Sequence, residues 1–122
     1  KEIVRATIEA VAYQTHDLFE AMKHDGLRPK IVKVDGGMVM NNWFSQFLSD
    51  IVNVKVLRPK VQETTALGAA FMAGLHIGIY KSLKDISKNW NLDKKFSPKM
   101  KNKSRTILIN GWEKAVKRAL IN

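Results

Sequence analysis

The spacing of hydrophobic residues predicts an alternation of helices and short strands. Apolar side chains recur every three or four positions over residues 1–23, which predicts an amphipathic helix that ends before Gly26. Residues 31–34 and residues 54–57 are short runs rich in β-branched side chains, so both are expected to be strands. Between them, apolar positions over residues 42–51 have helical spacing. A strand, a helix and a strand in this order predict a right-handed crossover with parallel strands.

The second half of the chain is expected to be mostly helical. Residues 63–80 are apolar and rich in Gly and Ala, and we interpret them as a buried helix. A short helical piece is predicted near residues 83–90, and a last helix from about Ser104, with Trp112 as a packing anchor. Small residues spaced by four along the first of these helices predict a shallow channel for close packing against the first helix or the sheet: Ala66, Ala70, Gly74 and Gly78.

These elements together predict an α/β fold in which a short parallel sheet is flanked by helices. A chain of 122 residues fits one modest domain, with residues 81–122 as a basic tail and terminal helix. Only two strands are expected, so the sheet would have an exposed edge. Strand pairing between copies through that edge would give a homo-oligomer.

Charge is the most informative part of the composition. The net charge of +10 lies almost wholly in residues 81–122, which hold twelve Lys and Arg against three Asp and Glu, whereas residues 1–80 hold nine against eight. Such asymmetry can indicate nucleic-acid binding. Lysines interspersed with Asn and Ser are more typical of a solvated surface, and we favour that interpretation.

Several classes of site are disfavoured by the residue inventory. The chain has no cysteine, so disulfides and thiolate sites are excluded and a cytoplasmic location is expected. The longest uncharged stretch, residues 64–80, is short for a membrane span, so no membrane partner is expected. His16 and His24 have no second His or carboxylate at a persuasive ligand spacing, and no metal site is expected.

The segment 34–42 holds the candidate chemistry. Gly36 and Gly37 stand between the first strand and the second helix, which is where α/β proteins commonly hold a nucleotide. Because glycine has no Cβ, both residues can adopt positive φ and let the backbone approach a flat ligand. Asn41 or Asn42 can cap the helix or reach a ligand. Taken alone, such a turn is more often purely structural.

Separated blocks of the sequence, in the same order, resemble the carboxy-terminal part of the FGGY carbohydrate kinases, and within that family the glycerol kinase branch. The resemblance covers nearly the whole chain, with gaps mainly between residues 81 and 103. Its blocks are residues 12–15, 35–41, 46–51, 56–59, 63–70 and 111–119.

The resemblance implies a partial actin-like, ribonuclease H-like ATPase domain. It further implies that ATP, with Mg²⁺, donates its γ-phosphoryl group to glycerol to give glycerol 3-phosphate and ADP. Such kinases have two lobes around a cleft and are several times longer than this chain. Their glycerol contacts and catalytic aspartate belong to the amino-terminal part, so no catalytic residue is expected here and the piece is expected to be inactive alone.

The resemblance transfers a nucleotide-binding role to matching positions. It implies that Gly37 and Asn41 contact the adenosine portion, and that Gly36 supports the turn. Asp35 could act as a base or hold Mg²⁺, although an Asp before a Gly-Gly turn more often accepts backbone N–H bonds. Residues 63–65 could contribute a positive helix terminus to the cleft, although packing and helix capping are favoured.

Two other functions remain open from the sequence. One is a related FGGY kinase that acts on a sugar or another polyol, because the substrate contacts lie outside this chain. The other is a basic nucleic-acid-binding or adaptor module in which the Gly-Gly pair is only a turn.

Overall fold

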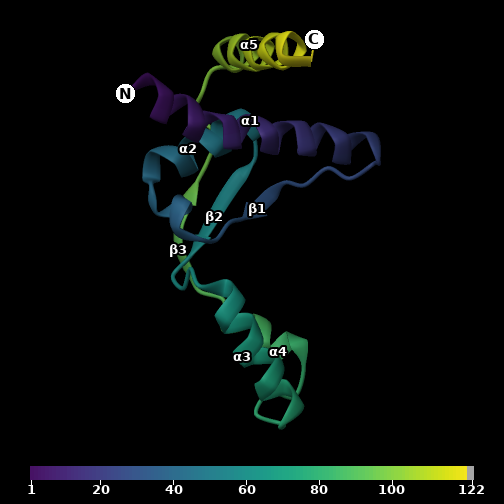
Figure 1. The fold of residues 1–122 in the computed structure, drawn as a ribbon. Coiled ribbons are helices and arrows are strands. Elements are labelled where there is room, and N and C mark those ends of the chain that lie inside the picture. Colours follow the sequence, from purple (N-terminus) through teal and green to yellow (C-terminus); the bar gives the residue numbers. More distant parts are fainter. Residues whose placement is uncertain (121–122) are drawn as a thin grey trace.

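The computed structural model describes residues 1–120 as five α-helices, one short 3-10 helix and three strands (Figure 1). In chain order these elements are α1 (Glu2–His24), β1 (Ile31–Lys33), the 3-10 helix η1 (Gly37–Met40), α2 (Asn42–Val52), β2 (Lys55–Pro59), α3 (Thr64–His76), α4 (Leu83–Ser87), β3 (Leu92–Phe96) and α5 (Asn102–Leu120).

The sheet has three strands in the order β1-β2-β3. β1 and β2 are parallel, with Val32 opposite Val56, so the predicted crossover unit is confirmed. β3 pairs antiparallel with β2, with Phe96 opposite Val56. The sheet is therefore mixed, and the expected short parallel sheet accounts only for its β1–β2 half. Pro59 ends the central strand, where the pairing with β3 is irregular.

β3 was not predicted because its sequence lacks the alternation of a half-buried strand. Of its five residues only Phe96 is buried, and the others, including Lys94 and Lys95, are exposed. Lysines on an edge strand discourage pairing with other chains. Their abundance made this segment resemble a surface loop.

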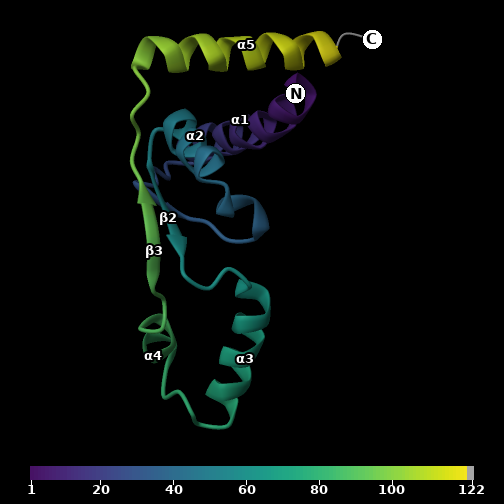
Figure 2. The ribbon, with the colours of Figure 1, turned by 90° about the vertical axis from the view of Figure 1, so that its left-hand side faces the viewer.

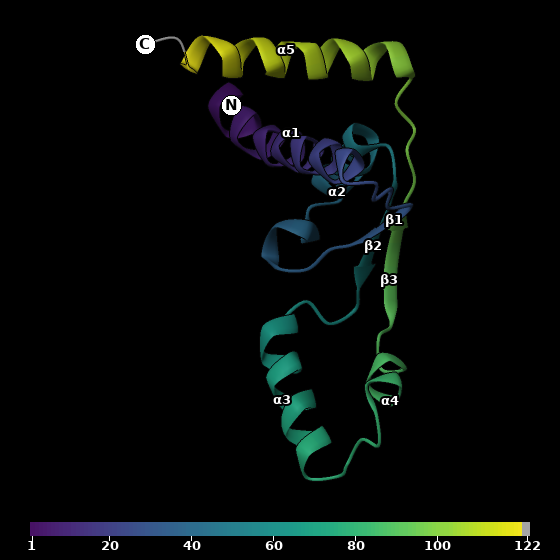
Figure 3. The same cartoon turned by 90° about the vertical axis from the view of Figure 1, so that its right-hand side faces the viewer.

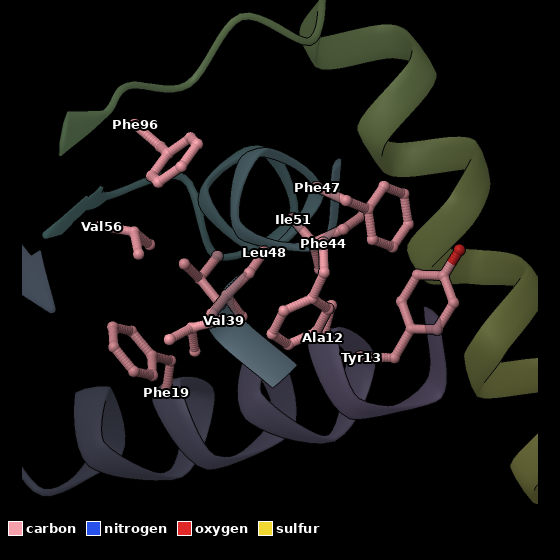
Figure 4. Packing of buried hydrophobic residues seen from close by; sticks show 11 residues of the cluster. Ala12, Tyr13, Phe19, Val39, Phe44, Phe47, Leu48, Ile51, Val56 and Phe96 are labelled. Carbon is pink, nitrogen blue, oxygen red and sulfur yellow. The ribbon is translucent and has the colours of Figure 1, made fainter. Parts of the chain in front are cut away.

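The hydrophobic core lies between α1, α2 and the sheet (Figure 4). α2 contributes the largest share, five of the eleven residues, and its Ile51 is fully buried. The other buried apolar side chains come from α1, η1, β2 and β3, so all these elements are fixed to one another. The cluster consists of Ala12, Tyr13, Phe19, Val39, Phe44, Phe47, Leu48, Ile51, Val52, Val56 and Phe96.

α5 crosses α1 on the side away from the sheet (Figure 2). The Trp112 ring stacks on Tyr13 at a centroid distance of 5.5 Å, and its indole N–H donates to Asp17 Oδ2 at 2.7 Å. The packing role predicted for Trp112 is confirmed. α5 begins two residues earlier than expected, at Asn102.

α3 differs from its predicted role. The helix stops at His76 instead of Tyr80, and Gly74 is its one buried residue. Gly78 lies beyond its end, with φ of +82°. Figures 1 and 3 show α3 and α4 at the opposite end of the sheet from α1 and α5, and neither α1 nor a strand makes extensive contact with α3. The expected close packing of the small-residue channel on the first helix or the sheet is therefore wrong.

The small residue at position 74 instead accommodates a local ring. A Cβ at Gly74 would lie 2.9 Å from two carbons of the Tyr80 side chain. The Tyr80 ring also makes an edge contact with Phe71, at 5.6 Å between centroids. None of the helices over residues 1–120 combines the length and apolar character needed to cross a membrane.

Candidate functional site

The first glycine of the pair is required by the backbone. After β1, Val34 N–H donates to Leu57 O at 3.1 Å and extends the pairing with β2. Gly36 then adopts φ of 83° and ψ of 172°, a conformation that is essentially restricted to glycine. Its N–H donates to Gln62 O at 3.3 Å. Gly36 thus supports the turn, as expected, and ties it to the segment before α3.

The second glycine has no such backbone requirement. Gly37 is exposed and begins η1, whose residues have the negative φ of a 3-10 helix, so the expectation of positive φ holds only for Gly36. A Cβ built on Gly37 would meet no atom within 4 Å. The surface beside Gly37 is therefore open, and nothing in the described chain demands a glycine there.

Asn41 joins η1 to α2 and caps α2. Its Oδ1 accepts hydrogen bonds from the backbone N–H of Trp43 at 2.9 Å and of Phe44 at 3.3 Å. The capping role predicted for Asn41 or Asn42 belongs to Asn41. The side chain is exposed, and because its oxygen is engaged by α2, its amide N–H groups are the part available to a ligand.

Asp35 is tied to α3. Its Oδ2 accepts a hydrogen bond from the Thr64 hydroxyl, in place of the backbone N–H bonds that the sequence favoured. Glu63 precedes α3 without a side-chain capping bond. Asp35 therefore serves to fix the start of α3 next to the glycine turn.

Sequence reasoning missed Arg58. This residue of the central strand β2 is buried, with 6% of its surface exposed. Its Nη1 donates to the carbonyl oxygens of Val39 at 2.8 Å and Met40 at 3.1 Å, and its Nε donates to Asp93 Oδ2 at 2.7 Å. A charged side chain inside an apolar strand was the available signal, because such a residue is rarely buried without partners.

The site therefore has a defined geometry. Figure 1 shows η1 and the turn before it lying beside the carboxyl ends of β1 and β2, next to α2. Gly37 and Asn41, at the two ends of η1, are both exposed, and Arg58 donates to the carbonyls of Val39 and Met40 between them. Within residues 1–120 no group of three or more His, Cys, Asp or Glu could hold a metal ion.

A family model for the C-terminal domain of the FGGY family of carbohydrate kinases matches residues 1–77. The chain belongs to the FGGY family. This match includes the glycine turn and Asn41 and ends at the close of α3.

Curated relatives of the chain are glycerol kinases. It is 53% identical over 118 residues to glycerol kinase 1 of Pseudomonas aeruginosa and 54% identical over 121 residues to a glycerol kinase of Thermoanaerobacter pseudethanolicus. These alignments cover 97% and 98% of this chain but 24% of each relative. The chain thus spans about a quarter of the length of the FGGY kinases it matches.

Solved structures show the same architecture. A Plasmodium falciparum glycerol kinase crystallised with ADP aligns with a TM-score of 0.81 and 40% identity, over 98% of this chain and 24% of that one. A xylulose kinase from Lactobacillus acidophilus aligns with a TM-score of 0.76 at 23% identity over the same shares, which shows the fold alone. The predicted fold class, part of an actin-like ATPase domain, is confirmed.

Proposed function

We propose that this chain is the ATP-binding carboxy-terminal portion of a glycerol kinase, which transfers the γ-phosphoryl group of ATP to glycerol and yields glycerol 3-phosphate and ADP. The main support is the 51–54% identity to glycerol kinases over nearly the whole chain. The xylulose kinase of the same fold is only 23% identical, so glycerol is favoured over a sugar as the acceptor.

The open surface at Gly37 supports the nucleotide-binding part of the proposal. No contact within the described chain excludes a side chain at Gly37, so a glycine is needed there only if something outside the chain lies against it. An adenosine group is such a ligand, because its flat base and ribose can lie against bare backbone. The Asn41 amide N–H groups would then donate to the same ligand.

The surface formed by Gly37 and Asn41 would contribute to the reaction by positioning the nucleotide. Phosphoryl transfer depends on placing the γ-phosphoryl group in line with the acceptor and on stabilising charge, and holding the adenosine fixes the direction of the phosphate chain. Mg²⁺ supplies charge neutralisation on the phosphates when bound. The described residues present no cluster of ligands for it, so we assign this chain no metal-binding residue.

The test compares two glycines in the longer enzyme that carries this segment. Neither Gly37 nor Gly111 has positive φ, and a Cβ at either meets no atom within 4 Å, so Ala is tolerated at both. Gly37→Ala should weaken ADP binding about tenfold, which corresponds to about 1.4 kcal/mol. Gly111→Ala, in α5, should leave it unchanged. Isothermal titration calorimetry with ADP measures both.

The outcomes separate the three functions. Loss of affinity in Gly37→Ala alone, with glycerol as the preferred acceptor, supports the proposal. Equal ADP affinity in both variants contradicts the proposed nucleotide contact at Gly37. A preference for another polyol contradicts the assignment of glycerol as the acceptor. Absence of ADP binding together with polynucleotide binding that falls steeply with salt would identify a basic nucleic-acid-binding module instead.

A further inference from the structure

The backbone between the two proposed nucleotide contacts is held by one buried side chain. Val39 and Met40 lie between Gly37 and Asn41, and their carbonyls both accept from Arg58 Nη1, at 2.8 and 3.1 Å. We propose that Arg58 is a positioning residue for the nucleotide, which it does not touch, and that it sets the spacing of Gly37 and Asn41. This inference rests on the proposed function.

The position of the Arg58 side chain is fixed by its surroundings in the sheet. It belongs to β2, the middle strand of the sheet, and is 6% exposed. Its Nε donates to Asp93 of β3 at 2.7 Å, and its guanidinium carbon lies 5.5 Å from the centre of the Phe96 ring. The guanidinium is planar and donates in two directions, so it joins β3 on one side to η1 on the other.

η1 needs such support. It is a single four-residue turn of 3-10 helix, in which hydrogen-bond geometry is poorer than in an α-helix. Its last carbonyls carry partial negative charge, which a buried cation stabilises. Ser45 donates a second bond to Val39 O at 2.9 Å, so the turn retains one anchor when Arg58 is changed. Loss of Arg58 should therefore loosen η1 without unfolding it.

Arg58→Lys tests the positioning role because lysine keeps the charge but cannot reproduce the two-directional donor geometry. In the longer enzyme, the backbone amides of residues 36–41 should exchange hydrogen faster. ADP affinity should fall about tenfold, which corresponds to about 1.4 kcal/mol. The KM for glycerol should not change, because the family resemblance places the glycerol contacts in the amino-terminal part of such kinases.

Arg105→Lys is the matched control. Arg105 also donates through its guanidinium to several acceptors, namely Asp50 O at 2.6 Å, Asn102 Oδ1 at 3.2 Å and Met100 O at 3.3 Å. These bonds join α2 to the start of α5 and involve no residue of η1. Arg105→Lys should lower thermal stability to a similar degree while ADP affinity and exchange at residues 36–41 stay as in the parent enzyme.

The results distinguish this inference from the proposed function. A parent enzyme without ADP affinity refutes the proposed function itself. A parent enzyme that binds ADP, with Arg58→Lys binding equally well or with both lysine variants equally weakened, refutes only the positioning role of Arg58.

A second variant covers the case in which Arg58→Lys does not fold. Asp93→Asn keeps the size of the side chain that accepts from Arg58 Nε and weakens this hydrogen bond because the negative charge is lost. It should raise exchange at residues 36–41 and weaken ADP binding about threefold, less than half of the free-energy change of a tenfold loss. Unchanged exchange and affinity in a folded Asp93→Asn enzyme would also count against the proposal.

Discussion

The adjacent residues Gly36 and Gly37 are glycines for different physical reasons. At Gly36 the requirement is conformational, since φ of 83° with ψ of 172° strains any other residue. At Gly37 the backbone is ordinary and the space beyond it is open. A substitution at Gly36 should therefore damage the turn itself, whereas one at Gly37 should be felt only when a ligand occupies the adjacent space.

Asn41 caps α2 and, in the proposed function, contacts the nucleotide, and substitution can separate these two roles. Asn41→Asp keeps an acceptor for the N–H groups of Trp43 and Phe44 and places a negative charge at the start of α2, so the free energy of unfolding should change by less than about 0.5 kcal/mol. It removes the amide N–H donors and adds a charge that repels phosphates. We therefore expect ADP affinity to fall without loss of stability.

The control is Asn41→Ala, which removes both the cap and the donors. It should lower the free energy of unfolding by about 1 kcal/mol and weaken ADP binding as well. Urea unfolding and calorimetric titration of the longer enzyme measure the two effects. An Asn41→Asp enzyme that binds ADP as well as the parent would show that the amide makes no contact with the nucleotide.

At the scale of elements, the contact between α1 and α5 depends on Tyr13. Its hydroxyl donates to Glu9 Oε2 at 3.2 Å, and Figure 4 shows its ring directed from α1 toward α5. The ring stacks on Trp112 and meets the edge of Phe47 at 5.7 Å. Burial, aided by the nearby Glu9 carboxylate, raises the pKa of Tyr13 to about 12 from the ordinary 10.0.

This raised pKa predicts a loss of stability in alkali. Between pH 10.0 and about 12 the unfolded chain releases the Tyr13 proton while the folded chain retains it, so the stabilisation present below pH 10 is lost as the pH rises. The free energy of unfolding should fall by about 1 to 2 kcal/mol across this range. Tyr13→Phe has no titratable hydroxyl at this position, so its free energy of unfolding lacks this pH-dependent contribution.

Urea unfolding of both proteins at a series of pH values measures the difference. All other titratable groups are common to both proteins, so only the difference between the two curves reports on Tyr13. Parallel curves from pH 9 to pH 12 would mean that the hydroxyl titrates alike in the folded and unfolded states.

Elements with a clear local signal could be predicted from the sequence, and elements defined by distant contacts could not. The periodicity of α1 and α2 and the β-branched residues of β1 and β2 are local properties, and all four elements were predicted within about two residues of their observed bounds. β3 forms through its pairing with β2, and its lysine-rich sequence carries no local signal of a strand.

The residues of the site also differ in whether the sequence alone could identify them. Gly36, Gly37 and Asn41 are close together in the sequence, whereas the contact of Arg58 with η1 depends on the fold.

At the scale of the whole molecule, the end of the fold that carries α3 and α4 packs against few other residues. Figures 2 and 3 show α3 and α4 extending away from the core formed by α1, α2 and the sheet. Large apolar side chains in and after α3 are exposed, including Met72 at 52%, Ile77 at 70% and Ile79 at 68%. An apolar helix of this kind is normally buried against other protein. The prediction that α3 is buried failed because the described chain contains no surface that covers it.

The exposed apolar surface predicts that the isolated 122-residue chain self-associates. The sheet edges at β1 and β3 offer a second route, but the lysines of β3 oppose pairing there, so α3 should dominate. Sedimentation velocity should show a weight-average coefficient that rises with concentration. Met72→Lys combined with Ile79→Lys should suppress that rise, because charge on the apolar face disfavours its burial.

The control adds the same charge elsewhere. Gln14→Lys combined with Asn110→Lys places two lysines at exposed polar positions of α1 and α5, and association should persist. If both double variants suppress association equally, general charge repulsion is responsible and the apolar face of α3 is not the contact. A parent chain that sediments as a monomer at every concentration would show that the lysine-rich surface already outweighs this apolar area, since net charge of +10 opposes association.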